Sequence, residues 1–184
     1  MSFEEIENRI KQKEQRKVIE TYRKSQRIFL MTSRFNNATV EENKRFREKG
    51  WPEGCLYCAP QRVSNNIPIH SKLMVLEMNN DTNKIIAVGM CVNKPFLEKY
   101  SVYQDANYNR FNYIGKYRIP RERLDATEEA VFKALDKLCF SGADHMKRGN
   151  GLKQFPAKIL YNCQSIINIS EFVEQMFIKR FSKK

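Results

Sequence analysis

The segment 142–151 contains the residues best suited to hold an anion. It reads Gly-Ala-Asp-His-Met-Lys-Arg-Gly-Asn-Gly and contains three of the seven glycines in the chain. Glycine lets the backbone approach a ligand closely, and exposed amides beside cations form a cradle for phosphate. The segment matches neither the P-loop nor the dinucleotide fingerprint. We expect phosphate binding here by Lys147, Arg148 and backbone amides around Gly149, and His145 is a candidate for reading a base edge. The alternative is a flexible basic connection between a helix and a strand.

Aromatic and basic side chains alternate in a second segment, residues 109–119. Tyr113 lies close in sequence to Lys116 and Arg118, a combination that suits stacking of unpaired bases beside a charged backbone. Trp51 is a second candidate for stacking, and Asn93, which follows a predicted strand, is a candidate for reading a base edge. The alternative for the aromatic residues is a place in the core.

Cys55 and Cys58 form a Cys-x2-Cys pair. A structural zinc site needs a second pair, and none follows at a suitable spacing. Pro60 blocks the helix that a thioredoxin-like redox motif requires. The chain has five cysteines, an odd number, which indicates reduced thiols in a reducing compartment. We therefore expect no metal, no cofactor and an intracellular, cytoplasmic location.

Signals for catalysis are few. The sequence has no nucleophile elbow, no zinc-protease motif and no kinase motif set. Asp144 and His145 are the acid–base candidates, but the other carboxylates are scattered, whereas a metal-dependent nuclease needs them clustered. The sequence favours a binding module over an enzyme. An enzyme that acts on nucleic acid or nucleotides stays the alternative.

The charge of the chain points to the class of partner. Lysine and arginine number 33 against 21 acidic residues, which gives a net charge of +12. Phosphate polyanions are the common partners of such proteins, so we predict binding to nucleic acid, with RNA favoured over DNA. No apolar run is long enough for a membrane helix, and the first residues are not a signal peptide. A third possibility is a virion or assembly protein whose charge neutralises a packaged genome, and the oligomeric state is left open.

The pattern of apolar residues predicts one α+β domain over residues 27–184, preceded by a helical extension over residues 1–26. The domain is expected to be a small mixed β-sheet or an open barrel with flanking helices. Thr39 is the expected N-cap of a helix over residues 40–49, Asp125 of a second, and Ser170 is expected to open the last. The expected helices and strands, in chain order, are helix 3–24, strand 27–33, helix 40–49, strands 55–58, 72–78, 84–92 and 109–119, a helix after residue 125 and a helix from residue 170.

Seven short segments together resemble a family of uncharacterised proteins encoded by large DNA viruses of eukaryotes. The resemblance covers roughly residues 27–160. The order of strands and the basic glycine segment also resemble the PUA-like superfamily, which includes the EVE, ASCH and YTH domains. That resemblance implies a small β-barrel that binds RNA or a modified nucleobase, although only Trp51 and the tyrosines are candidates for its aromatic cage. The seven segments are Leu30-Met-Thr-Ser33, Phe35-Asn-Asn37, Leu56-Tyr-Cys-Ala-Pro60, Leu76-Glu-Met-Asn-Asn80, Asn83-Lys-Ile85, Tyr113-Ile-Gly-Lys-Tyr-Arg118 and His145-Met-Lys-Arg-Gly149.

Overall fold

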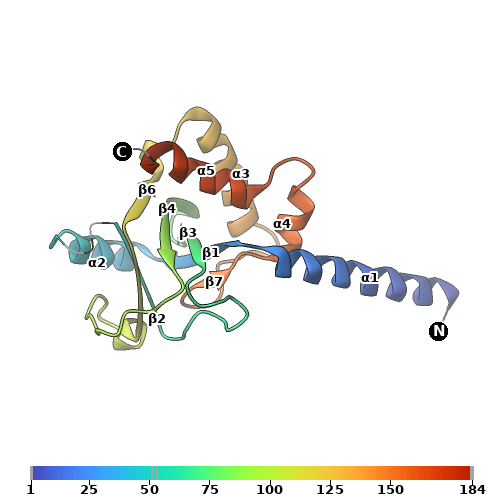
Figure 1. Ribbon diagram of the computed structural model, residues 1–184, viewed down its shortest axis with the longest axis horizontal. Coiled ribbons are helices and arrows are strands. Elements are labelled where there is room, and N and C mark those ends of the chain that lie inside the picture. The colour runs from blue at the N-terminus through green and yellow to red at the C-terminus, as the bar shows by residue number, and fades with distance from the viewer. Residues whose placement is uncertain (1, 51, 53, 183–184) are drawn as a thin grey trace.

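Two β-sheets and five α-helices make up the protein in the computed structural model, which describes residues 2–50, 52 and 54–182 (Figure 1). The larger sheet has the strand order β6-β4-β3-β1-β7, and the smaller sheet pairs β2 with β5. The strands are β1 (Ile28–Phe35), β2 (Cys55–Ala59), β3 (Lys72–Asn79), β4 (Lys84–Val92), β5 (Phe111–Gly115), β6 (Tyr117–Pro120) and β7 (Lys153–Gln154). The helices are α1 (Phe3–Ser25), α2 (Asn37–Arg47), α3 (Ala126–Phe140), α4 (Ala157–Cys163) and α5 (Ile169–Phe181), with 3-10 turns η1 (Ala106–Asn109) and η2 (Arg121–Arg123).

The larger sheet is mixed. β1 and β3 are parallel, and all the other pairs in this sheet are antiparallel. β3 and β4 form a hairpin whose turn is organised by Asn79, since its Oδ1 accepts hydrogen bonds from the amides of Asp81 and Thr82. The fold class predicted from the sequence, α+β with a mixed sheet and an N-terminal helix, is therefore confirmed, and the two sheets that the described residues form do not close into a barrel.

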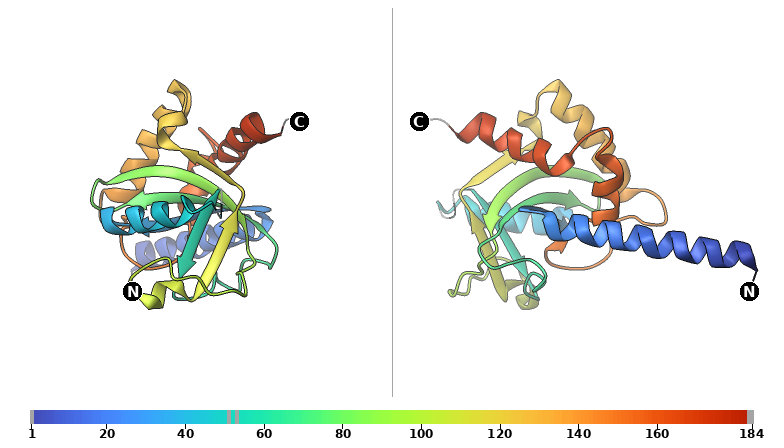
Figure 2. Two further views of the ribbon diagram at one scale, coloured as in Figure 1. Left: turned by 90° about the vertical axis from the view of Figure 1, so that its left-hand side faces the viewer. Right: turned by 45° about the vertical axis from the view of Figure 1, so that its right-hand side comes forward.

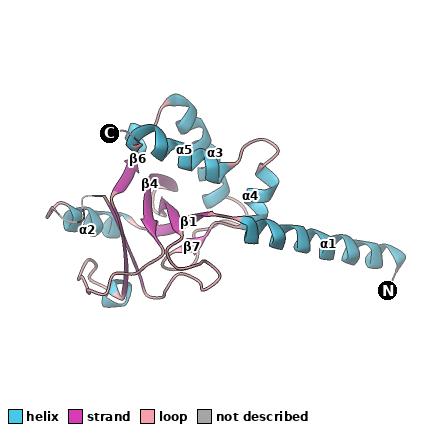
Figure 3. Cartoon of the chain, viewed as in Figure 1, coloured by secondary structure: helices cyan, strands magenta, loops and turns pink. Residues whose placement is uncertain are grey.

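Both faces of the larger sheet are covered, which explains why β1 and β3 are apolar almost throughout. Side chains alternate between the faces. On the helix face, Leu30 and Met74 join the core formed with α3, α4 and α5. On the opposite face, Met31 and Val75 pack against the smaller sheet and α2. Figure 3 shows the helical layer on one side of the strands, with α1 apart from it.

The smaller sheet lies against β4, as the left-hand view of Figure 2 shows for β2 and β5 in front of the larger sheet. Two glycines permit this contact. A β-carbon on Gly115 would lie 1.9 Å from the carbonyl oxygen of Met90, and one on Gly89 would lie 2.0 Å from the hydroxyl of Tyr57. Neither position accepts a side chain, because such separations are far inside van der Waals contact.

α1 projects away from the rest of the molecule (Figure 1). It has no buried residue, and near its C-terminal end the ring of Tyr22 meets that of Tyr161 in α4 edge-on at 5.6 Å. Phe3 is 83% exposed. Among the described helices none is apolar enough over a sufficient length to cross a membrane.

Several boundaries differ from the prediction. The N-cap of α2 is Asn36, whose side chain accepts from the amide of Thr39, so the helix begins earlier than expected. Asn168, and not Ser170, caps α5. The strand expected over residues 109–119 is two strands, because the chain leaves one sheet at Gly115 and joins the other at Tyr117.

Candidate functional site

A pocket of about 370 Å³ opens at the end of β1. Within the described residues β7 pairs with β1 only at Met31 and Thr32, so no described strand lies beside β1 beyond these residues on that side. The chain from Gly149 to Gly151, the start of α2 and the turn η1 surround this edge and form the walls. The pocket thus lies between three segments that are far apart in the sequence.

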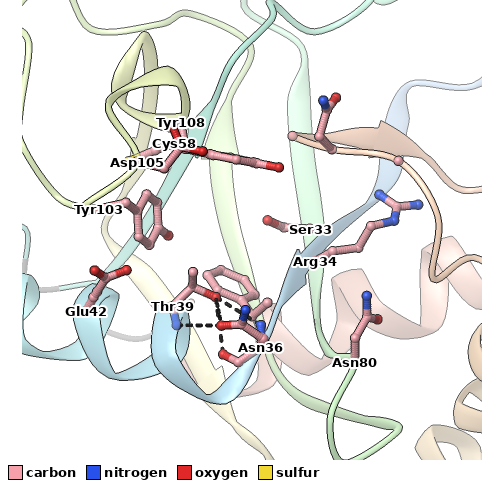
Figure 4. A pocket seen from close by; sticks show the side chains of 14 residues that line it. Ser33, Arg34, Asn36, Thr39, Glu42, Cys58, Asn80, Tyr103, Asp105 and Tyr108 are labelled. Atoms are coloured by element: carbon pink, nitrogen blue, oxygen red, sulfur yellow. Dashed lines mark hydrogen bonds between the residues drawn. The ribbon is translucent and has the colours of Figure 1, made fainter.

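Arg34 is the cation of the pocket (Figure 4). Its Nε donates to the carbonyl oxygen of Met146 at 2.6 Å, while its buried Nη1 has no hydrogen-bond partner among the described residues. No described carboxylate forms an ion pair with it, and burial lowers the pKa of the guanidinium. Two other partly buried arginines do have acidic partners: Arg118 pairs with Glu77, and Arg180 pairs with Glu128.

The predicted glycine segment lies over this guanidinium. Gly149 has a φ of +97°, and a β-carbon there would stand 4.0 Å from Cζ of Arg34. Asn80 holds the segment through its Nδ2, which donates to the carbonyl oxygen of Lys147 at 3.1 Å. The Oδ1 of Asn80 is buried and has no partner in the described part of the chain. Arg34 and Asn80 therefore place a free donor and a free acceptor beside the same loop.

Aromatic and acidic groups form the opposite wall, as Figure 4 shows for Tyr103 and Glu42. The Tyr103 hydroxyl accepts from Nδ2 of Asn43, and burial raises the pKa of this phenol. Glu42 Oε1 accepts from the amide of Gln104 at 3.1 Å. Asp105 caps η1 through Oδ1. The pocket therefore has a cationic side and an anionic side.

The residues of segment 142–151 have different positions relative to this pocket. Gly149 lines it. Arg148 is exposed, and Lys147 contributes its carbonyl to Asn80. Nδ1 of His145 accepts from the amide of Lys147 at 3.3 Å, and no hydrogen bond joins His145 to Asp144 within the described residues. The arrangement therefore favours anion binding over acid–base chemistry in this segment.

Four of the other predicted site residues lie elsewhere. Tyr113 is fully buried, and its hydroxyl accepts from the amide of Val63, so no ring face is open to a base. Asn93 is buried, and its Nδ2 donates to the carbonyl of Ile67. Arg118 is committed to its pair with Glu77. Lys116 is exposed and lies 5.9 Å from the centre of the Tyr117 ring.

Trp51 lies outside the described residues. Arg34, Asn80, Glu42 and Tyr103 were not predicted from the sequence as binding residues. One signal for Arg34 was present, since it is the charged residue in the otherwise apolar and hydroxylic run Ile-Phe-Leu-Met-Thr-Ser-Arg-Phe. Nothing in the sequence brings α2, the β3–β4 turn and the glycine segment together, because that requires the tertiary fold.

Cys55 and Cys58 are both on β2 and both buried. Residues three apart on a strand point to opposite faces, so these thiols do not converge on one ion. Burial raises the pKa of each to about 12, which keeps both protonated. Across the described residues no group of three or more His, Cys, Asp or Glu side chains could hold a metal.

A second, more open hollow of about 520 Å³ lies on the other side of α2 and includes Lys44, Arg47 and Arg118. Its guanidiniums have partners. Arg47 Nε donates to Oδ1 of Asn43, and Arg118 pairs with Glu77. Glu48 and Glu122 also line this hollow, so the unpaired cation of the pocket at β1 is the better anion site.

Comparison with known proteins adds no relative: no family model, curated protein or solved structure matches the chain.

Proposed function

We propose that this protein is a nucleic-acid-binding module that prefers single-stranded RNA and receives one nucleotide in the pocket at the end of β1. The observation that carries the proposal is the unpaired guanidinium of Arg34 beneath the glycine segment. A partly buried cation without a carboxylate is costly unless an anion or acceptor reaches it. Arginine is also the residue that best matches the geometry of phosphate oxygens.

Two further features of the site support a phosphate. The N-terminus of α2 faces the pocket through Asn36 and Thr39, and helix N-termini favour negative charge. The amide of Asn37 donates to the Asp81 carboxylate at 2.8 Å, so this end of α2 would act on a phosphate through the helix dipole and not through that amide. The net charge of +12 would attract a polyanion to the surface before a phosphate enters the pocket.

Asn80 gives a reason to favour RNA. Its buried Oδ1 can only accept, so it needs a donor from the ligand. The ribose 2′-hydroxyl is a donor that deoxyribose lacks, and it is the group by which proteins distinguish RNA from DNA. A pocket of this volume, at the low end of the range for small-ligand sites, has room for one nucleotide.

The experiment compares two arginine-to-methionine variants by fluorescence anisotropy with a short mixed-sequence RNA and the DNA of the same sequence. Arg34→Met removes the pocket cation. Arg148→Met is the matched control, because it removes the same charge from the exposed part of the glycine segment. We expect Arg34→Met to weaken RNA binding about 10- to 100-fold, the range for a lost hydrogen bond to a charged group. Arg148→Met should weaken it about fivefold at most, as for an exposed charge.

Thermal melts of both variants establish that they are folded. If Arg34→Met unfolds, Arg34→Lys replaces it in the test, because lysine keeps the charge but lacks the planar guanidinium that binds two phosphate oxygens at once. Binding of the parent should weaken with salt, with a slope of about −0.7 per phosphate contact in log K against log salt. If the two methionine variants lost RNA affinity equally, Arg34 would contribute only its charge and the pocket would not be a phosphate site. Absence of RNA binding at low salt would end the proposal.

A further inference from the structure

The two sides of the pocket carry opposite charge, and this polarity constrains the ligand beyond its phosphate. Arg34 lies on one side, and Glu42 and Tyr103 lie on the other (Figure 4). A nucleotide has the same polarity when its base bears a hydrogen-bond donor, because its phosphate is anionic and the far edge of its base donates. A base whose far edge is a carbonyl would instead bring an acceptor to the acidic side.

Glu42 has the capacity to read such an edge. Its Oε1 accepts from the amide of Gln104, whereas Oε2 accepts no hydrogen bond from any described residue. Glu42 also forms no ion pair with a described cation, so its charge is not neutralised by a neighbour. An ionised carboxylate only accepts hydrogen bonds, and Glu and Asp accordingly accept from the amino group of cytosine.

The aromatic residues support a planar ligand on this side. Tyr103 is 8% exposed and is fixed by the hydrogen bond from Asn43 to its hydroxyl, and Tyr108 is half-buried in the same wall. Aromatic rings stack on every base, so they give affinity without choosing among bases. The choice therefore depends on the polar group next to them, which is Glu42.

We propose that the pocket selects a nucleotide whose base carries an exocyclic amino group, as cytosine and adenine do, and rejects uracil. The amino group donates to Glu42 Oε2 while the phosphate is bound by Arg34. This inference rests on the proposed function and deepens it, since it assigns the class of base. Uracil presents a carbonyl oxygen in place of the amino group, and two acceptors that face each other without a donor are unfavourable.

The test measures binding of the 5′-monophosphates of cytidine, adenosine and uridine by competition against the labelled RNA. We expect the parent protein to bind the cytidine and adenosine monophosphates about tenfold more tightly than uridine monophosphate, the low end of discrimination by one base contact. Glu42→Gln should remove or invert the preference, because its amide nitrogen can donate to the uracil carbonyl. The Gln side chain keeps an oxygen for the amide of Gln104, so the local structure is preserved.

Glu41→Gln is the matched control, because Glu41 is the adjacent, exposed residue of α2 and does not line the pocket. It changes the net charge equally and should leave the preference of the parent intact. Equal binding of all three nucleotides to the parent would overturn the inference, as would inorganic phosphate competing as well as cytidine monophosphate. If either result came with a large loss of RNA affinity in Arg34→Met, the proposed function would stand and only the assignment of the base would fail.

Discussion

Replacing Glu77 with glutamine tests the buried ion pair that supports the centre of the fold. The carboxylate accepts three hydrogen bonds, from Nε and Nη2 of Arg118 at 2.9 and 2.7 Å and from the Tyr57 hydroxyl at 3.0 Å. The side chains of Arg118 and Glu77 are 17% and 7% exposed. Burial alone would lower the pKa of Arg118, but the carboxylate more than offsets this and raises it.

Glu77→Gln leaves the guanidinium charge in place without its counter-charge. Removing one partner of a buried pair costs about 3–5 kcal/mol, and the residual exposure of Arg118 places the expected loss near 3 kcal/mol. Glu174→Gln is the control: Glu174 pairs with Lys72, and these side chains are 22% and 46% exposed. An exposed pair of this kind contributes about 0–1 kcal/mol.

Urea unfolding followed by circular dichroism measures both losses at the same pH and salt concentration. Adding Arg118→Met to Glu77→Gln should recover part of the loss, because the unpaired charge is then removed as well. The reasoning is refuted if Glu77→Gln is no more destabilising than Glu174→Gln, since the pair would then behave as a surface contact.

Three further outcomes are expected. Deleting residues 1–24 should leave a cooperative unfolding transition, because α1 has no buried residue, and a loss of soluble protein would contradict this. Gly115→Ala should destabilise by about 1–3 kcal/mol or more in urea unfolding, because its β-carbon would meet the Met90 carbonyl. The hydrogen bond from Arg180 lowers the pKa of Glu128 below its usual 4.5. The ion pair therefore stabilises the fold fully above pH 4.5, and this stabilisation is lost as the pH falls through the lowered pKa. The acid limb of a stability–pH profile should therefore be shallower in Arg180→Met, and an unchanged limb would exclude this pair as its cause.

Local sequence patterns were sufficient to predict most of the helices and strands, but they were not sufficient to predict the pocket at the end of β1. The periodicity of residues 3–24 and the Asp125 capping box located α1 and α3, since both depend on neighbours within one turn. α4 and β7 were not predicted, because seven and two residues carry too little periodicity. The aromatic face expected at Tyr113 is core, since the smaller sheet packs it against the larger one.

The site depends on which face of a strand each charge occupies, and this follows from register. Arg34 and Glu77 lie on neighbouring parallel strands, β1 and β3, and Arg34 is aligned with Met78 and not with Glu77. Aligned residues of a sheet share a face, and their sequence neighbours point to the opposite one. Glu77 therefore lies on the face that packs against the smaller sheet, where it pairs with Arg118. Arg34 lies on the face that packs against α3, α4 and α5, where no described acid forms an ion pair with it. A shift of one residue in this register would bring Arg34 to Glu77 and remove the anion site.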